Sequence, residues 1–284
     1  MKACFCIPFG ARSQRFVAAV FFLCSLLGQA ETASANSRYF FHGDGKLGSK
    51  KSSVHFENLQ PRLKALLDYL QDQLTQGKGE IRIISGHRSR QYNESLRRKG
   101  KLAAKASLHL EGMAADFSLQ GVAPKTLWNY IRNLDCCGAG FYSGSAVHVD
   151  TGPSRFWDQT SSKVFTDISN SNKQIYLTTD YDVYYPGERL SFKIVRVTEY
   201  PFGVSKKALI LKGTKPWKEI TLDQKESCRE IQNQEDSTRF VFSLPEETTP
   251  PEEKLKLKVT FCQKPSEEMP AATLSNPFII APLK

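Results

Sequence analysis

Leucine recurs at spacings of three and four between residues 56 and 76, which is the pattern of one face of an α-helix. This face consists of Leu59, Leu63, Leu66, Leu67, Leu70 and Leu74. Gly77 and Gly79 follow, and glycine is common where a helix ends. The pattern therefore predicts an amphipathic helix that packs its leucine face on a hydrophobic core.

Further short elements are expected in the first half of the chain. Residues 80–84 are typical of a buried strand, which would place Arg88 just beyond its C-terminal end. Residues 91–98 and 124–134 have a helical pattern, and Pro124 suits the first turn of the second helix. The first half therefore combines helices with short strands.

From about residue 163 the pattern changes to short alternating or apolar runs, separated by Pro and Gly at turns. These runs are 174–177, 190–197, 208–211, 239–242, 255–261 and 278–280. Their spacing favours an antiparallel sandwich over a βαβ unit. We therefore expect an α+β protein, with a small antiparallel sheet and helices followed by a β-sandwich-like domain.

The N-terminus is typical of an export signal, because a basic start precedes an apolar run at 16–27 and small residues. That run is shorter than the ~20 residues that span a bilayer, although a retained anchor is the alternative. We expect a signal peptide at 1–35, a lead-in segment at 36–54, and domains at 55–160 and 161–284. Export would make disulfides possible. The remaining cysteines are Cys136, Cys137, Cys228 and Cys262, whose pairing the sequence leaves open.

The chain is basic, with 39 Lys and Arg against 29 Asp and Glu and a net charge of +10. Residues 1–35 contain three basic residues and one acidic residue, so their removal leaves +8. Such a charge suits contact with an anionic wall polymer or lipid headgroups, or it only aids solubility. No nucleic-acid motif is present, so we expect no nucleic-acid partner.

Two separated segments contain histidine and aspartate. Zinc at a hydrolytic centre takes three nitrogen or oxygen ligands and keeps a fourth position for water. His109, Asp116 and His148 can supply the three ligands.

The chain must turn between the first two of these residues. In one helix their side chains would lie roughly 10 Å apart along the axis, and in one strand they would point to opposite faces. Gly112 permits a tight reversal between them. Residues 145–150 favour a strand with His148 and Asp150 on one face. The opposite face, which we expect to contact a core, consists of Val147 and Val149.

Three motifs resemble those of a known family. The segment SLHLEGMAAD at 107–116 resembles the SxHxxGxAxD signature of M15-type zinc peptidases, which include D-alanyl-D-alanine carboxypeptidases and murein endopeptidases. The segments ISGHRS at 84–89 and VHVDTG at 147–152 are similar to the YcbK-like subgroup, or domain of unknown function 882. The likeness covers residues 55–157 and implies the M15/hedgehog-like zinc peptidase fold for this region.

This resemblance implies Zn²⁺ as the cofactor and a peptide bond in peptidoglycan stem peptides or cross-links as the substrate. It also implies that Arg88 contacts the substrate, because a guanidinium can hold a carboxylate or a developing oxyanion through two donors. A structural ion pair is the alternative for Arg88. Ser107 is a second candidate for substrate binding.

The general base is not defined by the resemblance. Several members of the wider fold have an acidic residue three positions before the final histidine or a histidine two before it, and Ser145 and Ala146 occupy these positions here. Asp150 shares the strand face with His148 and is the candidate catalytic base, or it orients a ligand imidazole. Glu111 is a further candidate, and a solvent-exposed turn glutamate is its alternative.

Two functions are therefore considered. The first is an exported zinc metallopeptidase, periplasmic or associated with the cell wall, that hydrolyses peptidoglycan as an endopeptidase or carboxypeptidase. The second is a non-catalytic module that retains the zinc peptidase fold and binds the cell wall or a protein. In either case residues 165–284 could contact a protein or wall polymer.

Overall fold

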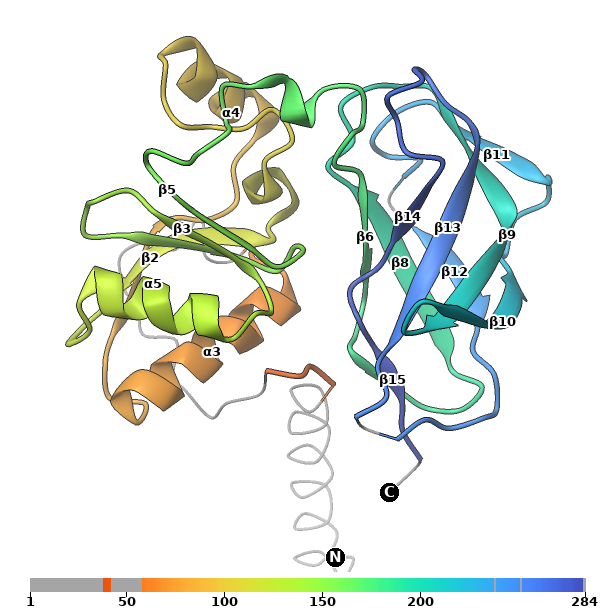
Figure 1. The fold of residues 1–284 in the computed structure, drawn as a ribbon, viewed down its shortest axis with the longest axis horizontal. Coiled ribbons are helices and arrows are strands. Elements are labelled where there is room, and N and C mark those ends of the chain that lie inside the picture. The colour runs from red at the N-terminus through yellow and green to blue at the C-terminus, as the bar shows by residue number, and fades with distance from the viewer. Residues whose placement is uncertain (1–37, 42–57, 238, 251, 283–284) are drawn as a thin grey trace, which may run out of the picture.

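The fold of the protein was analysed in a computed structural model (Figure 1). The structure describes residues 38–41, 58–237, 239–250 and 252–282. The expected signal peptide at 1–35 and most of the lead-in segment lie outside these residues. Within the described ranges, no helix is long and apolar enough to span a membrane.

A mixed five-stranded sheet forms the centre of the first part of the chain, residues 58–158. Its strands are β1 (Ile81–Ser85), β2 (Ala114–Leu119), β3 (Gly138–Phe141), β4 (Val147–Asp150) and β5 (Arg155–Asp158). They lie in the order β1-β2-β4-β3-β5, and only β3 and β5 pair in parallel.

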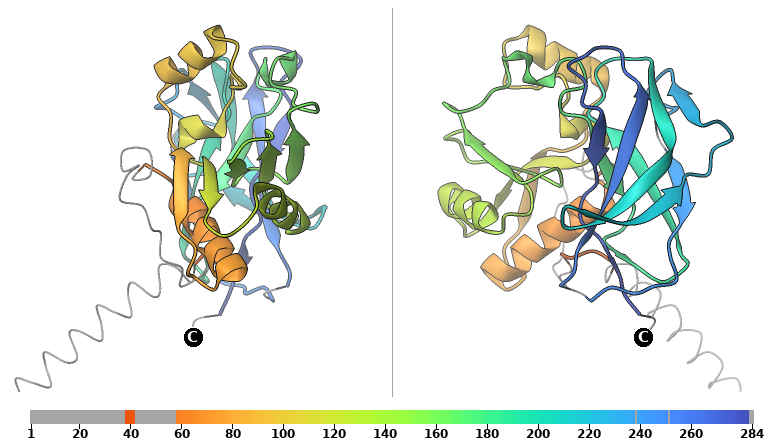
Figure 2. Two further views of the ribbon diagram at one scale, coloured as in Figure 1. Left: turned by 90° about the vertical axis from the view of Figure 1, so that its left-hand side faces the viewer. Right: turned by 45° about the vertical axis from the view of Figure 1, so that its right-hand side comes forward.

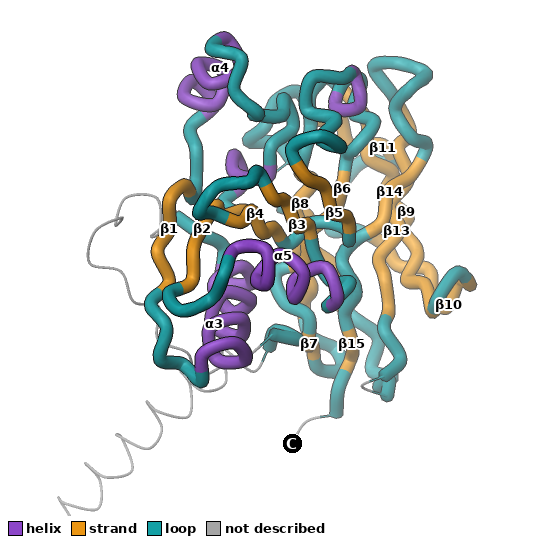
Figure 3. Tube along the Cα trace, turned by 60° about the vertical axis from the view of Figure 1, so that its left-hand side comes forward, coloured by secondary structure: helices purple, strands orange, loops and turns teal. Residues whose placement is uncertain are grey.

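Two helices, α3 (Pro61–Thr75) and α5 (Pro124–Asn133), lie on one face of this sheet (Figure 1; Figure 3). The expected leucine face of α3 is buried in one cluster with side chains of the sheet and α5. Val147 and Val149 of β4 belong to the same cluster, as their alternation predicted. The opposite face of β2 and β4 therefore points away from the two helices. The third helix, α4 (Arg90–Arg98), buries only Asn93.

The second part, from residue 176 onward, is built from strands. They are β6 (Tyr176–Thr179), β7 (Val183–Tyr184), β8 (Arg189–Val195), β9 (Phe202–Lys212), β10 (Lys215–Thr221), β11 (Cys228–Ile231), β12 (Phe240–Ser243), β13 (Leu255–Gln263), β14 (Ala272–Leu274) and β15 (Ile279–Ile280). One sheet has the order β10-β9-β13-β14 with β11 also on β9, a second has the order β12-β8-β6, and β15 pairs with β7. Side chains from the two larger sheets share one core. Helices and several sheets thus coexist, in agreement with the expected α+β class.

The two parts are packed against each other (Figure 2). Arg62 of α3 is 6% exposed and donates through Nε to Asp182 Oδ1 at 2.9 Å and through Nη2 to the Thr179 carbonyl at 2.7 Å. A separate apolar cluster also crosses the boundary. Its members are Leu108, Met113 and Ala114 of the first part, with Tyr176 and Val195 of the second.

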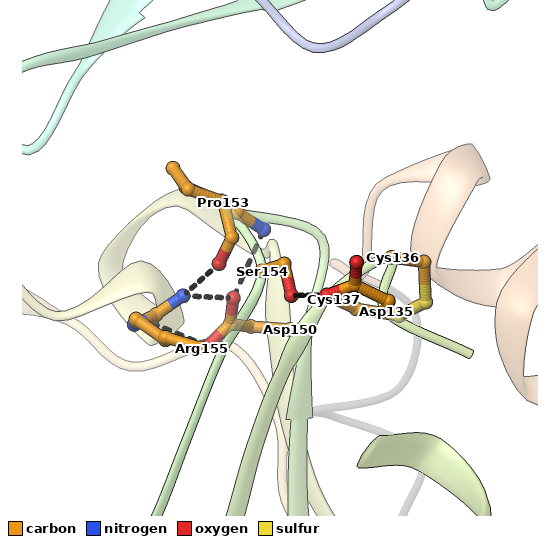
Figure 4. Close-up of a disulfide and its surroundings, with 8 residues drawn as sticks. Asp135, Cys136, Cys137, Asp150, Pro153, Ser154 and Arg155 are labelled. Atoms are coloured by element: carbon orange, nitrogen blue, oxygen red, sulfur yellow. Dashed lines mark hydrogen bonds and ion pairs between the residues drawn. A yellow bond between two sulfur atoms is a disulfide. The ribbon is translucent and has the colours of Figure 1, made fainter. Parts of the chain in front are cut away.

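Two disulfides join the four cysteines. Cys136 and Cys137 are bonded to each other at the start of β3 (Figure 4). Cys228 of β11 is bonded to Cys262 of β13, with 6.0 Å between their Cα atoms. This bridge passes over β9 at Gly203, where a Cβ atom would lie 2.6 Å from the Cys228 sulfur. The crossing therefore depends on glycine.

Candidate metal centre

Three side chains converge on the sheet face that points away from α3 and α5. Asp116 of β2 and His148 of β4 are direct partners in the antiparallel ladder, so they lie side by side on one face. His109 reaches them from a short 3₁₀ helix, Leu108–Glu111, whose first turn is capped by Ser107. The register of two strands and one turn thus brings the three residues together.

The turn between His109 and Asp116 occurs at Gly112, as expected. Gly112 has a φ of 65°, in the left-handed region that favours glycine. A Cβ atom at this position would collide with the Asn58 carbonyl. The Gly112 carbonyl accepts a hydrogen bond of 2.8 Å from the Gln60 amide, which holds the turn against the start of α3.

The facing atoms are spaced as ligands of one small cation. His148 Nδ1 lies 2.9 Å from Asp116 Oδ1, and His109 Nε2 lies 3.4 Å from the same oxygen and 3.3 Å from His148 Nδ1. Tetrahedral zinc with ligands at about 2.0–2.1 Å requires about 3.3–3.4 Å between ligand atoms. Two of the three separations meet this value, and the third is shorter.

Each imidazole has an acceptor on its outer nitrogen. His109 Nδ1 donates to the Gly86 carbonyl at 2.7 Å, and His148 Nε2 donates to Asp150 Oδ2 at 2.9 Å. In the neutral tautomers that suit these partners, His109 Nε2 and His148 Nδ1 present lone pairs toward the Asp116 carboxylate. Without a metal ion, a proton on His148 Nδ1 forms the hydrogen bond of 2.9 Å to Asp116 Oδ1, and a metal ion would replace that proton, so the donor set fits a metal ion.

Burial and charge act in opposite directions on these groups. Burial lowers the pKa of His109, which is 2% exposed. Burial also opposes the charged form of His148, but its hydrogen bonds to Asp116 and Asp150 outweigh burial and raise its pKa. For Asp116, burial would raise the pKa, but the two histidines hold it well below its ordinary value. Asp116 therefore stays ionised and available as an anionic ligand.

Asp150 is held from several sides and is fully buried. Besides the His148 imidazole, it accepts from both Nη atoms of Arg155, at 2.9 and 2.6 Å, and from the Gly152 amide at 2.9 Å (Figure 4). Burial alone would raise its pKa, but the charge of Arg155 and the His148 hydrogen bond keep the pKa below its ordinary value. This environment favours the alternative in which Asp150 orients His148.

The first part of the chain matches known proteins. A family model described as peptidoglycan L,D-endopeptidase MepK matches residues 49–157. Peptidoglycan L,D-endopeptidase MepK of Escherichia coli strain K12 is 31% identical over 141 residues, which cover 46% of this chain and 78% of the relative. The probable peptidoglycan L,D-endopeptidase MepK of Haemophilus influenzae is 34% identical over 109 residues, covering 38% of this chain and 58% of the relative. This chain belongs to the MepK family.

Three further expected site residues of this MepK family member, Arg88, Ser107 and Asp150, line one cavity of about 330 Å³. Arg88 and Ser107 line it together with the three convergent side chains. Arg88 donates through Nη2 to Asp116 Oδ2 at 2.6 Å and through Nε to Ser85 Oγ at 2.9 Å. Arg88 is thus both an ion-pair partner of Asp116 and part of the cavity wall. Glu111 instead lines a second, smaller cavity, and burial raises its pKa.

Sequence reasoning missed several residues of the cavity. Arg155 holds Asp150, and the Trp157 ring centroid lies 5.1 Å from that of His148. The Trp157 indole donates to the Tyr142 hydroxyl at 2.6 Å. Arg196 of the second part also lines the cavity. It lies beyond the MepK family match, so no motif pointed to it.

Proposed function

We propose that this chain is a zinc-dependent peptidase that hydrolyses peptide bonds in peptidoglycan, with the L,D-endopeptidase activity named for its relatives. The supporting observation is the convergence of three metal-ligand atoms within 2.9–3.4 Å of one another in a chain that belongs to the MepK family. Peptidoglycan lies outside the cytoplasmic membrane, so the proposal includes export directed by residues 1–35.

In this proposal His109, Asp116 and His148 hold the zinc ion. When bound, zinc supplies a Lewis acid that polarises a carbonyl group and lowers the pKa of a water molecule. The Gly86 carbonyl and Asp150 hold the outer nitrogens of the two imidazoles, so that each inner nitrogen keeps its lone pair.

Arg88 has two roles in the proposed site. Its ion pair with Asp116 fixes the orientation of that ligand carboxylate. Because Arg88 also lines the cavity, its positive charge faces the place where a substrate carbonyl oxygen would become negative. Ser107 lies on the same wall and caps the 3₁₀ helix that presents His109. We propose that Ser107 contacts the substrate backbone.

Asp150 is proposed as a positioning residue for His148. Both oxygens of its carboxylate already accept hydrogen bonds from Arg155, and one of them also accepts from His148. A carboxylate so engaged, with its pKa held below the ordinary value, is a poor acceptor for a further proton. In the alternative, Asp150 is the catalytic base, and the effect of Asp150→Asn on zinc affinity and kcat separates the two roles.

The second part is proposed as a separate domain, 161–284, after a peptidase domain at 55–160. We propose that its two larger sheets form a β-sandwich, and that residues 165–284 contact wall polymer or a protein. This part lies beyond the family match and has its own hydrophobic core.

Zinc content and hydrolysis of purified sacculi test the proposed function. The parent chain should bind one zinc ion and release new amino groups from sacculi, and mass spectrometry of the muropeptides should identify the broken bond. A chelator should abolish release, and added zinc should restore it. His109→Ala should lose both zinc and release, whereas His87→Ala is the matched control because His87 does not line the cavity. Zinc binding and sacculus binding without release would instead indicate a non-catalytic module.

A further inference from the structure

The cavity beside the metal centre has walls from both parts of the chain. Arg88 and the three candidate ligands belong to the first part. Other lining residues come from the segment that joins the two parts and from the end of β8, and they include Lys163, Gln174 and Arg196. The MepK family match ends at residue 157, so these lining residues lie outside it.

Arg196 is held firmly in this wall. It directly follows Val195, which is 1% exposed and packs with Leu108 and Met113 in the apolar cluster between the two parts. Leu108 is the neighbour of His109, so the end of β8 rests on the turn that presents a ligand. Arg196 itself has a φ of 62°, in a region that non-glycine residues seldom occupy. The backbone that carries Arg196 is therefore packed beside the turn that presents His109.

The charges in the cavity wall are not balanced. Arg88 and Arg155 are paired with Asp116 and Asp150, which are the two carboxylates of the wall. Lys163 and Arg196 also line the cavity, and within the part of the chain that the structure describes neither forms an ion pair.

Arg196 has only partial hydrogen bonding. Its Nη2 donates to the neutral Gln174 amide oxygen, while its Nε is buried without a partner among the described residues. Burial, and then the like charge of Arg155, lowers the pKa of Arg196 to about 10 against the opposing charge of Asp150, so the guanidinium is still charged at neutral pH. This positive charge has no carboxylate partner among the described residues, so the guanidinium favours a carboxylate in the cavity.

We propose that Arg196 binds a carboxylate group of the peptide substrate, so that the second part of the chain completes the substrate site and selects anionic peptides. The inference rests on the proposed peptidase function. Lys163, which is exposed and lines the same cavity, adds to the positive charge there.

The test compares two forms of one purified cross-linked muropeptide, one with its free terminal carboxylates and one with these carboxylates converted to primary amides. The parent should prefer the carboxylate form. Arg196→Gln removes the charge but keeps a hydrogen-bonding side chain. It should raise KM for the carboxylate form about tenfold to hundredfold, the range expected for a hydrogen bond to a charged group, with little change in kcat. Its KM for the amide form should change little, and Arg196→Lys should recover part of the preference.

Arg189→Gln is the matched control, because Arg189 lies at the other end of β8 and pairs with the exposed Asp223. It should leave KM for both forms unchanged. Zinc content and the thermal midpoint of each variant show whether the metal centre and the fold are retained. Equal losses of Arg196→Gln on both forms, or no loss on either, would overturn the proposal. If Arg196→Gln does not fold, Arg196→Lys should show a smaller preference for the carboxylate form than the parent, and an unchanged preference would overturn the proposal.

A binding measurement separates this inference from the proposed function. If the parent hydrolyses neither form, the peptidase proposal fails, but calorimetric titration still compares the two forms as ligands. The parent should bind the carboxylate form more tightly than the amide form, and Arg196→Gln should remove the difference. Equal binding of the two forms by the parent would refute the role of Arg196 independently of catalysis.

Discussion

Replacement of Asp150 by asparagine tests how the candidate metal centre is built. Asparagine keeps the shape of the side chain but removes its charge and turns one oxygen into a donor. That side chain can no longer accept from His148 Nε2 and from both Nη atoms of Arg155 together. The His148 ring would lose the partner that fixes its tautomer and orientation.

The expected effect on metal binding follows from this single contact. Loss of the outer partner of a metal-binding histidine lowers metal affinity about 10- to 100-fold, or about 1.4–2.7 kcal/mol. The apo protein should also be destabilised, by less than the ~3–5 kcal/mol of a fully buried broken pair, because the Arg155 side chain is 31% exposed. Asp150 has a depressed pKa in the folded state, so its stabilisation is present above about pH 4 and is lost as the pH falls further. The difference between the variant and the parent should therefore shrink in acid.

The assay is competition for zinc with a chromophoric chelator, followed by kcat measurement at saturating zinc. Asp150→Asn should bind zinc more weakly and regain most of its kcat when zinc is saturating. The control is Asp158→Asn, which changes an exposed carboxylate of β5 that bonds only to its own turn. Unchanged zinc affinity with a kcat loss of about 10²- to 10⁴-fold would refute the positioning role and identify Asp150 as the base.

Three further predictions concern stability. Arg62→Ala should destabilise the protein by about 3–5 kcal/mol in urea denaturation, because it removes the buried partner of Asp182; a loss below about 1 kcal/mol would contradict this. Burial raises the pKa of Asp68 to about 6. The parent should therefore lose stability relative to Asp68→Asn as the pH rises from about 4 to 6. A difference between their thermal midpoints that is the same at all pH values would exclude this effect. The Cys228→Ser, Cys262→Ser double variant removes a disulfide between residues that are 34 positions apart, and its free energy of unfolding should fall by about 3–4 kcal/mol. An unchanged urea midpoint would show that the disulfide does not stabilise the fold.

Local patterns predicted the elements near the site well. The leucine spacing before residue 76 and the alternation around His148 both depend on one face meeting a core, and both faces are buried in the structure. The argument from the spacing of His109 and Asp116 required a turn, and Gly112 makes it. The direct pairing of Asp116 with His148 was not predictable, because it depends on the register of two strands distant in sequence.

Other features had no local signal. β10 is a mostly exposed edge strand, so its apolar side chains do not alternate clearly, and no strand was expected there. The partnership of Arg155 with Asp150 arises from the path of the chain between β4 and β5. Arg196 meets the cavity only because the second part packs on the first. Such contacts are set by tertiary packing, which periodicity does not encode.

The turn that presents His109 depends on packing from the second part of the chain. The apolar cluster that joins them consists of Leu108, Met113, Ala114, Tyr176 and Val195. A fragment that ends at residue 157 would keep all three proposed ligands but would expose the hydrophobic side of the His109 turn to water. Such a fragment should bind zinc more loosely than the whole chain. Truncation of the second part would thus weaken the proposed metal centre, even though that part supplies none of the three proposed ligands.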